Sequence, residues 1–160
     1  MHRDAAARVA FIAAIAMHVV AAVAAAVQPP PAELTALAAK AHASETIAAW
    51  CRGEFRPGRP GAFAAALGSG SGGGRYVVFE PDGTIEALAS FARGADLSCY
   101  TRAEANRLAE TIRRSDTIHG HLSPRWNTTI VCGFVDDTNA VCWQYSPADR
   151  ALVKIGEWVT

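Results

Sequence analysis

A predicted β-hairpin with one cysteine in each strand constrains the fold of this chain more than any other feature. Residues 127–145 contain two runs rich in Val, Ile, Thr and aromatic side chains, separated by a short polar turn. Facing residues of a hairpin have numbers with a constant sum, and a pairing centred on Asp137 places Cys132 directly opposite Cys142. Cysteines so placed are within reach of a disulfide, so the sequence predicts a hairpin crosslinked across its middle.

Strand alternation divides the side chains of this hairpin between two faces of a sheet. One face carries the two cysteines with Ile130, Phe134 and Ala140, and the other carries Val131, Val135, Val141, Trp143 and Tyr145. Both faces are apolar, so both need cover. We expect a helix at 102–114 to cover one face, and a hairpin at 76–88, an N-terminal helix or a partner to cover the other. If cover is incomplete, the face with Trp143 and Tyr145 is the expected binding surface.

Composition and charge limit the class of protein. The chain has 160 residues and is 51% hydrophobic, which suffices for one ordinary domain with a core. Much of the hydrophobic fraction is alanine before residue 67, so the larger apolar side chains of the core are expected in the C-terminal half. The formal net charge is +0, which disfavours electrostatic binding to the phosphates of nucleic acid. No nucleic-acid partner is therefore expected.

Residues 1–26 have the features of a signal peptide. A positively charged start precedes the uncharged apolar run 9–23, and sites of the form small-x-small end near Ala26. We expect cleavage there and a periplasmic or secreted protein. The alternative is a retained membrane anchor, because 9–27 is just long enough to span a bilayer. Contact with a membrane is expected only in that case.

Residues 27–67 are predicted to form a helix and a connector. Three prolines at 29–31 suit the approach to a helix, and an apolar stripe predicts that this helix extends over 32–50. The Pro- and Arg-rich stretch 52–61 is interpreted as a solvated connector, with an anion-binding loop as the alternative. The glycine-rich stretch 68–74 is interpreted as a flexible linker, because a strand pattern and no P-loop lysine follows it.

Residues 75–160 are predicted to form the compact domain. A tight Asp-Gly turn joins the two strands of the hairpin at 76–88. A capping box at 101–104 begins the helix 102–114, which has a regular apolar stripe, and the last strand is expected at 151–159. The predicted fold class is α+β: a small antiparallel sheet of about five strands, packed with one or two helices and stabilised by disulfides.

The chain has four cysteines, and an even number behind an export signal predicts two disulfides. The preferred pairing is Cys132 with Cys142 and Cys51 with Cys99, one of three possible connectivities. There is no CxxC motif and the spacings fit no zinc module, so neither a metal site nor a cofactor is predicted.

The polar stretch 115–126 is the best place in the sequence for chemistry. His119 and His121 would point the same way in an extended chain, and Asp116 is near enough to orient a general base. Such residues also collect by default in the loop between a helix and a strand, and an ordinary surface loop is the preferred interpretation.

Aromatic residues offer a second candidate site. Trp126, Trp143 and Tyr145 are candidates for a surface that binds a protein or a glycan, and core packing is the competing interpretation.

The leading hypothesis is a small exported, disulfide-stabilised, non-enzymatic domain that binds a protein or an envelope component. The first alternative is an exported hydrolase that uses His119 and His121. The second is a membrane-anchored accessory subunit of an envelope complex.

Overall fold

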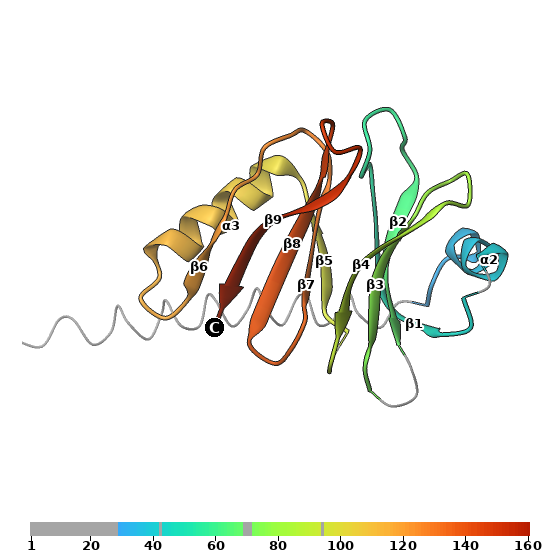
Figure 1. Cartoon of the computed structure of the whole chain (residues 1–160), viewed down its shortest axis with the longest axis horizontal. Helices are drawn as coiled ribbons and strands as arrows, with labels where there is room; N and C mark the ends of the chain where they lie inside the picture. The colour runs from blue at the N-terminus through green and yellow to red at the C-terminus, as the bar shows by residue number, and fades with distance from the viewer. Residues whose placement is uncertain (1–28, 42, 69–71, 94) are drawn as a thin grey trace, which may run out of the picture.

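The computed structural model describes residues 29–41, 43–68, 72–93 and 95–160, so the predicted signal segment lies outside the described residues. The described chain forms two antiparallel sheets and two helices (Figure 1). The first sheet has the order β1-β2-β3-β4, with β1 Thr46–Gly53, β2 Ala62–Gly68, β3 Gly74–Phe79 and β4 Ile85–Phe91. The second has the order β5-β7-β8-β9-β6, with β5 Leu97–Tyr100, β6 His119–Leu122, β7 Ile130–Phe134, β8 Asn139–Ser146 and β9 Ala151–Val159.

The elements pack as four layers, helix, sheet, sheet and helix. Helix α2 (Ala32–Lys40) covers the outer face of the first sheet, and α3 (Arg102–Arg114) covers the outer face of the second, as Figure 1 shows. Three apolar clusters fill the gaps between successive layers. The fold is therefore mostly β, and the predicted α+β class agrees with it only broadly.

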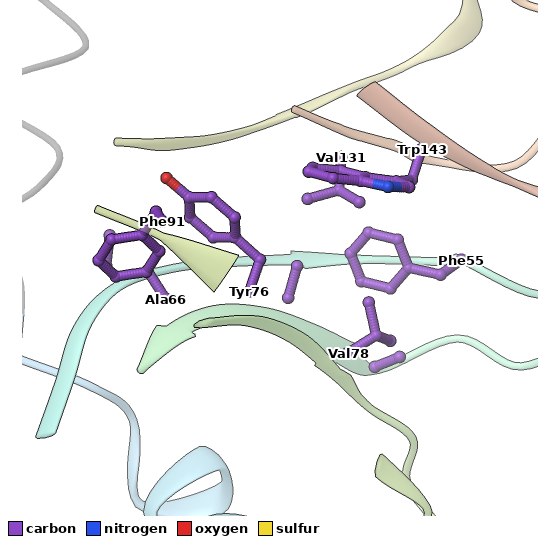
Figure 2. Packing of buried hydrophobic residues seen from close by; sticks show 10 residues of the cluster. Phe55, Ala66, Tyr76, Val78, Phe91, Val131 and Trp143 are labelled. Atoms are coloured by element: carbon purple, nitrogen blue, oxygen red, sulfur yellow. The ribbon is translucent and has the colours of Figure 1, made fainter. Parts of the chain in front are cut away.

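The central cluster lies between the two sheets (Figure 2). The ring of Tyr76 in β3 lies 4.7 Å from that of Phe91 in β4 and 6.1 Å from that of Trp143 in β8. Phe55 and Val131 complete the packing in this view. Aromatic side chains dominate the energetics of such a core because each removes a large apolar area from water.

The cysteine hairpin forms as predicted. Cys132 in β7 lies directly opposite Cys142 in β8 and is bonded to it, with their Cα atoms 4.1 Å apart. The second predicted disulfide, Cys51 to Cys99, is also present and joins β1 of the first sheet to β5 of the second. Both faces of the hairpin are covered, one by α3 and the other by the first sheet.

Three further predicted elements are confirmed. Helix α3 begins at a capping box in which Thr101 and Glu104 bond each other's backbone amides. Strands β3 and β4 pair around the Asp-Gly turn, with Phe79 opposite Ile85. The last strand, β9, has the predicted bounds.

The N-terminal part differs from the prediction. The helix predicted over 32–50 ends at Lys40, and residues 46–50 belong to β1. The predicted connector contains the end of β1 and a loop at 54–61, and Gly68 pairs with Gly74 at the end of the β2–β3 hairpin. Residues 69–71 of the predicted linker lie outside the described residues.

Strand β2 gives the physical reason for this difference. Its sequence, AFAAALG, alternates between Ala62, Ala64 and Ala66 in the central cluster and Phe63, Ala65 and Leu67 beneath α2. The strand is covered on both faces, so it needs apolar side chains throughout, and on the face toward the second sheet all three are alanine. Because β2 pairs with β3, the compact fold includes residues 46–68, and the described chain has nine strands where about five were expected.

Candidate ligand-binding groove

A groove of about 400 Å³ lies between helix α2 and two loops at one end of the first sheet. We call it the α2 groove. One wall is a single face of α2, since its lining residues recur three or four apart along the helix. The remaining lining residues come from the end of β1, the start of β2, the loop 54–61 and the turn 80–83. The full lining is Glu33, Ala36, Leu37, Lys40, Arg52, Pro60, Gly61, Phe63 and Pro81.

The floor of the groove is apolar and closely packed. Phe63 is buried, and its ring is contacted edge-on by Trp50, with centroids 6.1 Å apart. Leu34 and Ala38, on the opposite side of α2 from much of the groove wall, are buried against the sheet. This packing holds the helix in place. Phe63 is 1% exposed and forms the base of the groove, whereas the half-buried Leu37 and the exposed Ala36 supply the apolar surface that a ligand can reach.

The rim of the groove carries two cations, Arg52 and Lys40, and one carboxylate, Glu33. Arg52 stacks over the ring of Phe63, 5.3 Å from its centroid, and pairs with Glu33 at 3.3 Å. Lys40 at the other end donates a hydrogen bond to the carbonyl oxygen of Asp82 at 3.2 Å, and no described carboxylate lies within ion-pair distance of it. The carboxylate of Asp82 acts on Lys40 only from beyond ion-pair distance and does not line the groove, so the lining itself keeps an excess of one positive charge.

An arginine ties the two loop walls of the groove together. Arg56 in the loop 54–61 donates to Glu80 at 3.0 Å and to Glu86 in β4 at 2.5 Å. Glu80 is the first residue of the turn 80–83, whose Pro81 lines the groove. The same guanidinium lies over the ring of Tyr145 and donates to the carbonyl oxygen of Arg150, so it also contacts the β8–β9 hairpin. We call this arrangement the Arg56 clasp.

Glu80 is the most unusual member of the clasp. It is 1% exposed, and its Oε2 atom has no hydrogen-bond partner among the described residues. Burial raises the pKa of Glu80, although Arg56 opposes this by favouring the charged carboxylate. The clasp therefore places two carboxylates, Glu80 and Glu86, around one guanidinium in a site that is largely removed from water.

The histidines of the predicted chemical site line a different cavity, of about 540 Å³, between the end of α3 and strand β6. His119 and His121 both line it and are exposed, as expected for alternate residues of an edge strand. Asp116 is exposed but does not line this cavity, and no hydrogen bond joins it to either histidine. The structure thus brings the two histidines together without Asp116. The carboxylate beside His121 is instead that of Glu157, which lies opposite it in β9 and pairs with Lys154. No group of three or more His, Cys, Asp and Glu side chains in the described ranges could hold a metal ion.

The three aromatic candidates do not share one surface. Trp143 is 5% exposed and lies between the sheets, while Tyr145 is half-buried under Arg56. Trp126 is half-buried against the α3 side of the second sheet, where buried Gln144 donates to its carbonyl oxygen at 2.7 Å. A partner would not reach Trp143, because the first sheet covers the face that carries it.

The α2 groove was not identified from the sequence. Its lining comes from separate segments, and the predicted continuous helix over 32–50 would have removed the bend that creates it. The one available signal was the Arg- and Pro-rich stretch 52–61, for which an anion-binding loop was the alternative interpretation.

No helix in the described parts of the chain has the length and apolar character that crossing a membrane requires. Comparison with protein-family models, with curated proteins and with solved structures gave no match.

Proposed function

We propose that this protein is an exported, disulfide-stabilised binding module that holds an envelope component in the α2 groove. The observation that carries the proposal is the composition of the groove: an apolar floor under a rim that carries two cations and one carboxylate. Small-molecule sites commonly combine a concave apolar surface with a few polar groups that fix the orientation of the ligand.

The two disulfides support the location. Cys51–Cys99 and Cys132–Cys142 account for all four cysteines, and disulfides persist in oxidising compartments such as the periplasm and the extracellular medium. A binding module in such a compartment meets lipids, peptides and other envelope components. We therefore place the ligand among these.

Site-specific photo-crosslinking in the exported protein tests this proposal. A benzophenone side chain replaces Glu33 on the rim of the groove or, as the control, Ala39, which is exposed on α2 but does not line the groove. We expect a discrete adduct, detected by intact mass, at residue 33 and none at residue 39. Equal adducts at both positions, or none at either, would contradict the proposal.

A further inference from the structure

We infer that the α2 groove binds the carboxylate form of a fatty acid, with the alkyl chain along Ala36 and Leu37 of α2 and the head group at Lys40. The inference rests on the proposed function, namely that the groove is a binding site. It adds the chemical class of the ligand and its orientation in the groove.

The lining of the groove favours an alkyl chain over a peptide. Ala36, Leu37, Pro60 and Pro81 supply apolar surface, and the prolines have no backbone N–H to donate. A peptide main chain carries one donor and one acceptor at almost every residue, and burying these without partners is costly. An alkyl chain has no such groups, so it gains from apolar contact without leaving polar atoms unpaired.

The charges on the rim predict an anionic head group and the orientation of the ligand in the groove. Glu33 pairs with Arg52 at one end, whereas Lys40 at the other end donates to the carbonyl oxygen of Asp82 and has no carboxylate within ion-pair distance among the described residues. A single anionic group complements that ammonium, and the salt-bridge geometry suits a carboxylate. A cationic head group would instead be repelled.

The dimensions agree with a chain of medium length. Glu33 and Lys40 are seven residues apart on α2, which corresponds to about 10 Å along a helix axis. The cavity volume, about 400 Å³, is within the range of small-molecule sites. Decanoate is accordingly the probe of choice, and decanol and decyltrimethylammonium are its uncharged and cationic counterparts.

Titration calorimetry of the purified, oxidised protein, below the micellar concentration of each probe, tests the inference. We expect decanoate to bind about threefold more tightly than decanol, as an exposed ion pair allows, and decyltrimethylammonium to bind most weakly. Lys40→Gln should remove the preference for decanoate over decanol. Glu33→Gln should strengthen decanoate binding about twofold, because it releases Arg52 as a second cation. Equal affinities for decanoate and decanol in the wild-type protein, or an unchanged preference in Lys40→Gln, would overturn the inference.

A bulky substitution in the groove tests whether the probes bind there. Ala36→Trp should weaken all three probes at least tenfold, whereas Ala39→Trp on the same helix should bind them like the wild-type protein. Equal binding by both variants would show that the probes bind elsewhere and would overturn the inference. Tighter binding of a short apolar peptide with a free C-terminus than of decanoate would also overturn it.

The two proposals fail in distinguishable ways. A crosslinked adduct at residue 33 without a preference for decanoate would leave the groove as a binding site and refute only the ligand class. Absence of both would refute the proposed function as well.

Discussion

The ring of Tyr76 in the first sheet lies directly against Gly133 in the second. A Cβ atom on residue 133 would lie 2.6 Å from Cζ of Tyr76, closer than real Cβ contacts allow. Tyr76 is fully buried, and its hydroxyl donates to the carbonyl oxygen of Phe134 at 2.7 Å, with that of Asp96 at 3.1 Å as a second acceptor. The hydrogen bonds fix the ring, so it cannot move aside to admit a methyl group.

Gly133→Ala should therefore destabilise the protein by about 1–3 kcal/mol, the usual cost of overpacking a tight core. Denaturant unfolding followed by tryptophan fluorescence measures the change. Gly68→Ala is the matched control, because a Cβ atom on that strand glycine would meet only ordinary contacts at 3.8 Å. A loss in the control as large as that in Gly133→Ala would show that the packing against Tyr76 is not the cause.

Removing the hairpin disulfide with Cys132→Ser and Cys142→Ser should lower the free energy of unfolding by about 3 kcal/mol in the loop-entropy model. The two cysteines are 10 residues apart, and each serine also buries a hydroxyl without an assured partner, which adds to the loss. The Cys51–Cys99 bridge closes a longer loop, with a separation of 48, and its removal should cost about 4 kcal/mol. Comparison of the two double variants by urea unfolding checks the order.

Breaking the Arg56 clasp should be costly because it leaves Glu80 buried without its charge partner. Arg56→Met should destabilise the protein by about 3 kcal/mol, the scale for removal of one member of a buried ion pair. Arg59→Met is a matched control in the same loop, since the Arg59–Asp82 pair is largely exposed and should contribute less than about 1 kcal/mol. Equal melting temperatures for the two variants would rule out a special role for Arg56.

The buried carboxyl of Glu80 should also make stability depend on pH. Because its pKa is raised above the ordinary value of 4.5, the folded state holds this proton more tightly than the unfolded state. Stability contributed by Glu80 is therefore present at low pH and lost as the pH rises from 4.5 through the raised pKa. Glu80→Gln has no such proton to lose. As the pH rises above 4.5, the melting temperature of the wild type should therefore fall relative to that of Glu80→Gln. A constant difference between the two melting temperatures across the same pH range would contradict the prediction.

The elements predicted correctly are those that local sequence specifies. The capping box and apolar stripe of α3 lie within 14 residues, and the cysteine hairpin needs only an alternating pattern and a polar turn. In each case the neighbouring residues determine both the element and the face that it buries. Tertiary packing then selects among few alternatives.

The alanine-rich segment was mispredicted because its conformation depends on distant residues. Alanine has the highest helix propensity, so 46–50 extended the apparent pattern of α2. These residues are instead a strand, because β1 pairs with β2, which is in turn held between α2 and the second sheet. The α2 groove depends on the same long-range arrangement and could not be predicted before it.

The connectivity of the two disulfides has a consequence for how an exported chain would form them. The native pairs, Cys51 with Cys99 and Cys132 with Cys142, link consecutive cysteines in chain order. A chain that is translocated from its N-terminus presents its thiols in that same sequence. An oxidase that couples each cysteine to the next one to emerge would therefore produce the native connectivity directly, with no need for an isomerase to reshuffle the bonds.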